Sequence, residues 1–158
     1  MNHTVGISEM KVSNRTHDIL VTYSLGSCVG LSLYDPVARI GGLVHCMLPL
    51  SQIDPAKAKA RPSMFTDTGV VALLQRVLDL GGERKRLIAK VAGASCLLDD
   101  KGVFRIGERN YTVLRKVLWK NNILIAGEDV GGTITRTMIL YMATGKTIIK
   151  SRGQEVEL

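Results

Sequence analysis

The chain has 158 residues, of which 46% are hydrophobic and 22% charged, and its formal net charge is +7 at pH 7. These values exclude a large multidomain assembly and a disordered chain, and they predict one domain over residues 1–158. The basic excess would suit an acidic partner. However, one Trp, four Tyr and two Phe are few aromatic residues for base stacking, so we expect a solvated basic surface and no nucleic-acid interface.

Cysteine usage and the absence of apolar segments indicate a compartment. Cys28, Cys46 and Cys96 form no Cys-x-x-Cys pair and no zinc-finger spacing with histidine, so neither a disulfide framework nor a structural metal site is predicted. Residues 1–10 lack the apolar region of a secretory signal, and no run approaches the roughly 18 apolar residues of a membrane span. We therefore expect a soluble cytoplasmic protein without membrane insertion.

The first half of the chain shows strand patterns followed by one strong helix pattern. Apolar and β-branched runs predict strands at 18–23, 29–34 and 40–48. Residues 49–62 hold three of the four prolines and no sustained period, which is typical of a surface loop. Apolar spacing predicts a helix at 67–80, with Thr66 or Asp67 as its N-cap and Gly81-Gly82 as its stop.

The second half returns to strands. We expect a strand at 87–93, a helix at 110–121 and strands at 123–129, 135–144 and 146–151, the last two joined at Thr144-Gly145 as a hairpin. This order lacks the regular alternation of a Rossmann fold. It predicts an α/β sandwich of mixed β-sheets with helices packed on one face, in α/β/β layers.

The hairpin between residues 23 and 49 carries the chemistry-bearing pair. Asp35-Pro36 is a turn signal, and if Asp35 to Ala38 form the connection, Tyr34 pairs with Arg39 and Cys28 with His45. One face of the ribbon is then largely apolar. The other face places the Cys28 thiol beside the His45 imidazole among small residues, as a nucleophile and its base require.

Two interpretations of this pair remain open on spacing alone. In the first, His45 takes the proton of Cys28, and the turn Leu25-Gly26-Ser27 aims backbone N–H groups at a developing oxyanion, with Gly26 permitting the backbone geometry. The Ser27 hydroxyl is either a further donor there or a simple turn residue. In the second interpretation, Cys28 and His45 are a small core residue and a satisfied histidine.

Residue blocks along nearly the whole chain resemble those of the CheD family, the chemoreceptor glutamine deamidases of bacterial and archaeal chemotaxis. The blocks are Leu25-Gly26-Ser27-Cys28-Val29, Tyr34-Asp35-Pro36, Gly41-Gly42-Leu43-Val44-His45, Met47-Leu48-Pro49, Ala89-Lys90-Val91-Ala92-Gly93-Ala94, Ile106-Gly107-Glu108-Arg109-Asn110, Glu128-Asp129-Val130-Gly131-Gly132 with Arg136, and Thr144-Gly145-Lys146. They run in family order, so the resemblance is specific.

The resemblance implies a mechanism and partners. Cys28 would be the nucleophile, His45 the general base and acid, and Thr22 the group that orients the imidazole, with no metal or organic cofactor. The substrate would be a glutamine on the cytoplasmic domain of a chemoreceptor, and a CheC-type phosphatase would be the regulatory partner. Because a hydroxyl replaces the usual Asn or Asp as third member, we expect slow turnover.

Other residues carry weaker expectations. Where the family commonly shows Gly-Gly-Ala, this chain has Gly93-Ala94-Ser95, which would affect specificity or rate if that turn shapes the substrate groove. We expect Cys46, on the face opposite His45, and Cys96 to be core residues, and His3 and His17 to be surface residues. The set Asp129, Gly131, Gly132 and Arg136 is either a structural turn with a paired arginine or a substrate contact.

Two competing functions remain. The fold could be a binding module that docks on a CheC-type protein or on the receptor, with vestigial catalysis. A papain-like peptidase is a weaker alternative, because the short chain lacks a second lobe to form a long peptide cleft and has no evident Asn or Asp third member.

Overall fold

We describe a computed structural model of the chain, which covers residues 1–97 and 105–158. The strands are β1 (Asn2–Thr4), β2 (Met10–Ser13), β3 (Ile19–Leu25), β4 (Val29–Asp35), β5 (Ile40–Cys46), β6 (Ile88–Gly93), β7 (Ile125–Val130), β8 (Arg136–Tyr141), β9 (Thr147–Ser151) and β10 (Gln154–Glu157). The helices are α1 (Pro55–Ala60), α2 (Thr66–Asp79) and α3 (Ile106–Lys120), with short 3₁₀ turns at Ser51–Ile53, Pro62–Met64 and Arg84–Arg86.

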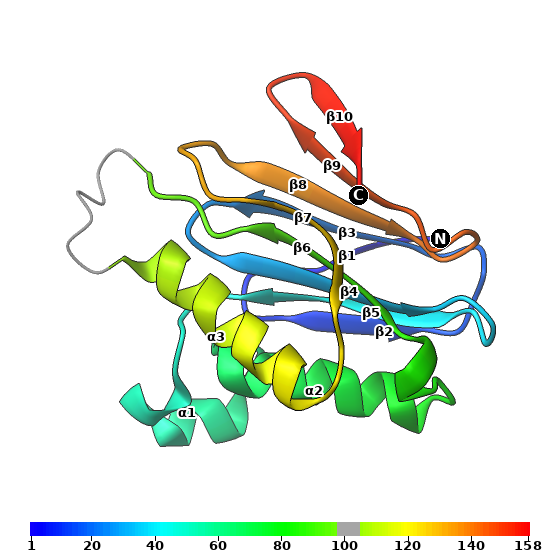
Figure 1. Cartoon of the computed structure of the whole chain (residues 1–158), viewed down its shortest axis with the longest axis horizontal. Coiled ribbons are helices and arrows are strands. Elements are labelled where there is room, and N and C mark those ends of the chain that lie inside the picture. Colours follow the sequence, from blue (N-terminus) through cyan, green and yellow to red (C-terminus); the bar gives the residue numbers. More distant parts are fainter. Residues whose placement is uncertain (98–104) are drawn as a thin grey trace.

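Two mixed sheets and one helical layer are stacked on one another. The first sheet has the order β1-β3-β8-β9-β10 and the second the order β2-β5-β4-β6-β7, with parallel pairs at β1/β3 and β6/β7 and antiparallel pairs elsewhere. Figure 1 shows α2 and α3 beneath the second sheet and the first sheet above it. The predicted α/β/β sandwich with helices on one face is confirmed.

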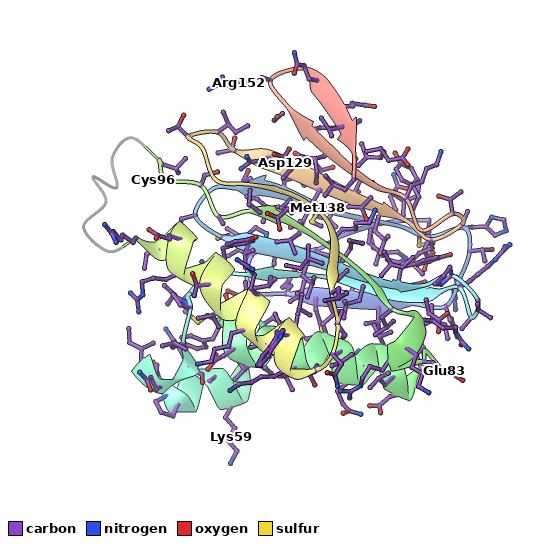
Figure 2. The ribbon with its side chains drawn as sticks, viewed as in Figure 1. Lys59, Glu83, Cys96, Asp129, Met138 and Arg152 are labelled. Carbon is purple, nitrogen blue, oxygen red and sulfur yellow. The ribbon has the colours of Figure 1, made fainter. Side chains whose placement is uncertain are left out.

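Alternation along the strands of the second sheet supplies two separate cores. Leu31, Leu33 and Val44 face the helices, where they meet Leu73 of α2 and Leu114 of α3. The other face of the same strands meets the first sheet, and there Leu43 packs with Leu20, Leu25 and Met138. Met138 lies between the sheets in Figure 2. Because β4 and β5 are buried on both faces, a polar side chain on either one is enclosed by protein.

The β4–β5 hairpin has a register two positions away from the predicted one. Asp35 pairs with Ile40 and Gly30 with His45, so Cys28 does not pair with His45. The connection is Pro36–Arg39, closed by the N–H of Arg39 donating to Asp35 O, and Arg39 adopts the left-handed φ of 56°. Because an even shift preserves the alternation of faces, the predicted division into an apolar face and a Cys28/His45 face is still correct.

The region after β5 differs more from expectation. The predicted loop at 49–62 contains α1, whose N-cap Asp54 accepts a hydrogen bond from the backbone N–H of Lys57, with Pro55 in its first turn. Helix α2 begins at Thr66 with Phe65 in the N-cap position, so neither Thr66 nor Asp67 caps it. The carboxylate of Asp67 instead holds the 3₁₀ turn through Ser51. The side chain of Thr66 points to Asn110 of α3.

Several helix and strand boundaries differ from the predicted ones. Helix α3 begins at Ile106, four residues before the predicted start, and the predicted hairpin between β8 and β9 at Thr144-Gly145 is confirmed. Strands β1, β2 and β10 were not predicted, because each is only three or four residues long and the short alternation of Met10 and Val12 in β2 is the one apolar pattern among them. Within the described ranges, no helix is both long and apolar enough to cross a membrane.

A buried carboxylate fixes the far end of the β4–β5 hairpin. Asp35 is fully buried and accepts hydrogen bonds from Arg86 at 2.9 and 3.0 Å and from the backbone N–H groups of Glu83, Val37 and Ala38. Burial alone would raise the pKa of this carboxyl, but these donors outweigh it and hold the pKa well below its ordinary value of 3.8.

We expect Asp35→Asn to lower the free energy of unfolding at pH 7 by about 3 kcal/mol, because it removes one partner of a buried ion pair. The folded-state pKa lies below the unfolded one, so the contribution of Asp35 is present above about pH 3.9 and is lost as the pH falls through the folded value. Urea titrations at pH 7 and pH 3 measure both effects, and the gap between variant and parent should narrow at pH 3.

Asp79→Asn is the matched control, since Asp79 is paired only with Gln75 on the exposed surface of α2. It should change the unfolding free energy by less than about 0.5 kcal/mol at either pH. Equal losses in the two variants would contradict the role of Asp35.

Candidate active site

His45 is an internal residue of β5 whose main chain is held from outside the hairpin. Its N–H donates to Glu9 O at 3.0 Å, and its carbonyl accepts from Ser8 N at 2.9 Å. The residue is fully buried and faces the gap between the two sheets. The segment before β2 therefore continues the pairing along β5 and fixes the main chain that carries the imidazole.

Thr22 of β3 meets the imidazole from the opposite sheet. Its hydroxyl oxygen lies 2.7 Å from His45 Nδ1 and 2.7 Å from Val5 O. A carbonyl only accepts hydrogen bonds, so the single hydroxyl proton must go to Val5 O. Nδ1 must then carry a proton and donate to Thr22, which leaves Nε2 unprotonated with a free lone pair. Nε2 is buried and has no hydrogen-bond partner within residues 1–97 and 105–158.

Cys28 lies immediately before β4 and on the same side of the ribbon as His45. The side chain is partly buried and packs against the core between the sheets, two residues from Gly30, which pairs directly with His45. A Cβ at position 30 would meet Met138 Sδ at 2.9 Å and Leu25 Cδ1 at 3.0 Å, so glycine is needed there. Sulfur and imidazole thus share one side of one ribbon as neighbours on a diagonal.

Burial keeps both groups uncharged at neutral pH. Burial raises the pKa of the Cys28 thiol above its ordinary value of 9.0, although its own backbone N–H acts in the opposite direction. Burial lowers the pKa of His45 to about 4. The resting pair is therefore a thiol next to a neutral imidazole that has a lone pair available.

The loop that presents Cys28 is held by the chain after β6. Ser95 N donates to Gly26 O and Ala94 N to Cys28 O, both at 2.8 Å. Ala94 has a φ of 54°, a left-handed conformation that costs roughly 1–2 kcal/mol with a Cβ present. Position 94 thus has a backbone conformation that favours glycine, although the residue there is alanine.

Gly26 and Ser27 fill part of their predicted roles. Gly26 is buried and has no left-handed φ, and a Cβ there would lie 3.0 Å from Leu97 Cδ1, so that a larger residue needs the leucine side chain to shift. The geometric reason predicted for Gly26 was therefore wrong. The backbone N–H groups of Ser27 and Cys28 donate to no backbone oxygen of the described ranges. They remain available as donors beside the sulfur.

Asn110 of α3 was not singled out as a site residue. Its side chain is fully buried, and Nδ2 donates to Ser27 O at 2.9 Å and to Met47 O at 3.1 Å. The sequence held a signal: Asn110 occupies the same stripe as Leu114 and Leu118, at spacings of four residues, and is the one polar member of those three.

Arg136 proves to be a structural residue. Its guanidinium pairs with Asp129 at 3.2 Å and donates to Ser95 Oγ at 2.8 Å and to Gly93 O at 3.2 Å. The prediction of a turn with a paired arginine is confirmed, with Gly131 and Gly132 at φ of 82° and 72°. Because Ser95 and the neighbouring Ala94 hold the Cys28 loop, Arg136 supports that loop from behind.

The remaining cysteines and histidines were only partly predicted. Cys46 is buried on the helix side of β5, as expected, but Cys96 is exposed and lies at the edge of the molecule in Figure 2, so its placement in the core was wrong. His17 is on the surface. His3 is not simply a surface residue, because its Nε2 lies 3.3 Å from the buried carboxylate of Asp18. No set of three or more His, Cys, Asp or Glu side chains in the described ranges is arranged to hold a metal ion.

Comparison with known proteins defines the class of this chain. Residues 47–151 match the family model described as CheD chemotactic sensory transduction. This match begins two residues after His45, so Thr22, Cys28 and His45 lie outside it.

Curated relatives cover the rest. The chain is 50% identical over 149 residues to the probable chemoreceptor glutamine deamidase CheD 1 of Syntrophus aciditrophicus, covering 94% of this chain and 93% of that protein. It is 49% identical over 154 residues to the probable chemoreceptor glutamine deamidase CheD of Solibacter usitatus, covering 98% and 91%. The chain belongs to the CheD family.

A solved structure, the hypothetical protein YfiH of Bacillus licheniformis, overlays with a TM-score of 0.42 at 14% identity, over 78% of this chain and 49% of that one. These values are too low to support a statement about fold or function.

The geometry of Thr22 predicts one tautomer of His45. Long-range ¹H–¹⁵N correlation spectra at pH 7 should show a protonated Nδ1 and an unprotonated Nε2, because Thr22 can only accept from the ring. Thr22→Val removes that acceptor and should abolish the preference, whereas Thr22→Ser should keep it. A protonated Nε2 in the unsubstituted protein would contradict the assignment.

The lowered pKa of His45 gives the direction in which pH changes the stability of the fold. The pKa of His45 in the folded chain, about 4, lies below the unfolded value near 6.5, so the unfolded chain binds more protons between these two values. The contribution of His45 to stability is thus complete above about pH 6.5 and is lost progressively as the pH falls toward 4.

Proposed function

We propose that this protein is a cysteine hydrolase that converts glutamine side chains of chemoreceptors to glutamate and releases ammonia. The single observation that carries the proposal is the unpartnered lone pair of His45 Nε2, buried on the side of the ribbon that bears the Cys28 thiol. The relatives are probable chemoreceptor glutamine deamidases, and they supply the reaction and the substrate class of the proposal.

In the first half of the reaction, His45 Nε2 takes the thiol proton as the sulfur of Cys28 attacks the side-chain amide carbon of glutamine. The carbonyl oxygen becomes an oxyanion, and the backbone N–H groups of Ser27 and Cys28, which donate to no backbone oxygen of the described ranges, would donate to it. His45 then returns the proton to the amide nitrogen, the C–N bond breaks, and ammonia leaves behind a thioester on Cys28.

In the second half, water replaces ammonia. His45 Nε2 takes one proton from water, the hydroxide attacks the thioester carbon, and the C–S bond breaks as the proton returns to sulfur. The products are a glutamate side chain on the former substrate and the original thiol of Cys28, so one water is consumed for each ammonia released.

Thr22 acts on the ring rather than on the substrate. By accepting from Nδ1–H it holds the tautomer in which Nε2 is basic, and it favours the imidazolium formed during the reaction. A hydroxyl carries no negative charge, so this stabilisation is weaker than that of an aspartate, and we expect slow turnover.

The substrate approaches from the end of the ribbon where the two groups lie. A groove of about 520 Å³ is lined by Leu48, Pro49, Leu50, Gln52, Ile53, Ile106 and Arg109, and neither Cys28 nor His45 lines it. Leu48 lies one residue beyond Met47, so the groove is near that end of the ribbon in the sequence. Gly26 and Ser27 do not line it, so their proposed role is confined to the oxyanion side.

The proposed setting is the cytoplasm, with the cytoplasmic domain of a chemoreceptor as substrate and a CheC-type phosphatase as regulatory partner. Three free cysteines in the chain are compatible with a reducing compartment, and the partner rests on the resemblance to the family.

Deamidation of a purified receptor cytoplasmic fragment, followed by peptide mass spectrometry, tests the function. Cys28→Ala should abolish the conversion of glutamine to glutamate, and His45→Ala should slow it by about 10²–10⁴-fold because general acid and base catalysis is lost. The controls are Cys96→Ser and His17→Ala, since both side chains are exposed, and both should be fully active.

Full activity of Cys28→Ala would overturn the proposal. If the parent protein binds the fragment without changing its mass, the chain is a docking module and not an enzyme.

The pH dependence separates a neutral pair from a preformed ion pair. Because His45 has a pKa of about 4 and that of Cys28 lies above 9.0, kcat/KM should rise with pH near 4 and stay level through pH 8. The rise occurs because a protonated imidazole cannot accept the thiol proton. A rise centred near pH 7 would contradict the neutral pair.

A further inference from the structure

We propose that Asn110 is a positioning residue, which ties together the two chain segments that carry Cys28 and His45. The inference rests on the proposed function, since it presumes that these two side chains act as a pair. Asn110 touches neither the thiol nor the imidazole, and it acts through the main chain on each side of them.

The side-chain amide joins two carbonyls that the sheet leaves free. The last residue pair of the β4–β5 ladder is Val29 with Cys46, so Cys28 and Met47 lie just beyond its end. There Nδ2 of Asn110 donates to Ser27 O, immediately before Cys28, and to Met47 O, two residues after His45. The amide therefore links the two chain segments just beyond the last residue pair of the ribbon, next to Cys28.

The orientation of the amide is fixed by its three partners. Thr66 Oγ1 donates to Asn110 Oδ1 at 2.9 Å, and the two carbonyls can only accept from Nδ2. An amide turned by 180° would place Oδ1 against two carbonyl oxygens in a fully buried site, which is strongly unfavourable. All of the hydrogen-bonding capacity of Nδ2 is thus spent on the two segments.

The side chain of Asn110 also connects the helical layer to the second sheet. Thr66 begins α2, Asn110 belongs to the second turn of α3, and the two carbonyls flank the ends of β4 and β5. Without the amide, nothing else in the described ranges donates to Ser27 O or Met47 O. The Cys28 segment would then be held by Ala94 N–H donating to Cys28 O, and the end of β5 by Met47 N–H donating to Met64 O. Neither bond joins the two segments to each other, and a misplacement of the sulfur relative to Nε2 by about 1 Å costs roughly 10²-fold in rate.

The decisive substitution is Asn110→Asp, which keeps the shape and replaces the donor Nδ2 by an oxygen. Asn121→Asp is the matched control at the other end of α3, where Nδ2 donates to Val117 O and Oδ1 accepts from Arg84. Both variants lose a side-chain amide donor to a backbone carbonyl, but Asn121 bonds within its own helix and only Asn110 bonds the ribbon end.

Two readouts separate positioning from simple support of the fold. The first is the deamidation of a receptor fragment, with kcat and KM measured separately at a temperature well below each variant's melting transition. The second needs no substrate: the rate at which iodoacetamide alkylates Cys28, followed by peptide mapping in a Cys96→Ser background because Cys96 is exposed. Each is repeated with His45→Ala to form a double-mutant cycle.

We expect Asn110→Asp to lower kcat by about 10²-fold and to change KM by less than about twofold. In the parent, His45→Ala should slow alkylation of Cys28, whereas in Asn110→Asp the same change should have little further effect, because thiol and imidazole are no longer held together. Asn121→Asp should keep both the parent kcat and the dependence on His45. An Asn110→Asp protein with the parent kcat, or with the dependence on His45 intact, overturns the inference.

A second variant covers a failure to fold. If Asn110→Asp does not fold, Asn110→Ser removes both amide donors without placing a charge in the core, and the same outcomes apply to it. The two proposals fail separately: full activity of Cys28→Ala ends the proposed function, while the alkylation cycle still reports on the role of Asn110 because it requires neither receptor nor turnover.

Discussion

One hydroxyl proton determines the state of the whole candidate site. Thr22 has a single hydrogen to donate, and the carbonyl of Val5 can only accept it. The ring nitrogen of His45 that faces Thr22 must therefore be protonated, and the other nitrogen is left as a base in a buried space. No charged group takes part in this arrangement. The imidazole is oriented by a hydrogen bond between uncharged groups, and burial keeps it neutral well below pH 7.

The two-sheet construction makes this contact possible and also makes it demanding. Thr22 belongs to one sheet and His45 to the other, so their distance is set by how the sheets pack, through side chains such as Leu43 and Met138. Two devices outside the sheets reinforce it. Residues 5–9 bond to the hydroxyl of Thr22 and to the main chain of His45, and Asn110 bonds the segments on each side of the ribbon end. The thiol and the imidazole are thus held by the segment before β2, by Asn110 of α3 and by the contact of Thr22 with His45 between the two sheets.

Local patterns in the sequence predicted the layers and the correct face of the hairpin, because strand alternation is insensitive to an even shift of register. They could not predict the register itself, because the turn places Arg39 in a left-handed conformation. Glycine or asparagine at that position would have indicated such a turn, but arginine does not. Thr22 was found only through family resemblance, because its contact with His45 depends on packing between sheets. Asn110 carried a signal as a polar residue on an apolar stripe, but its partners are backbone atoms 63 and 83 residues away. The strands β1, β2 and β10 are only three or four residues long, too short for a period to identify them, and their main-chain groups find partners at sheet edges.

The neutral state of Cys28 has a consequence for the redox behaviour of the molecule. Peroxide and most electrophiles react with thiolates, and a partly buried thiol whose pKa lies above 9.0 offers very little of that form at neutral pH. The solvent-facing sulfur of Cys96 is the more accessible target, and it lies away from the ribbon at the edge of the molecule. An oxidative burst would therefore mark the periphery of this protein first and spare the sulfur on which adaptation of a chemosensory signal would depend.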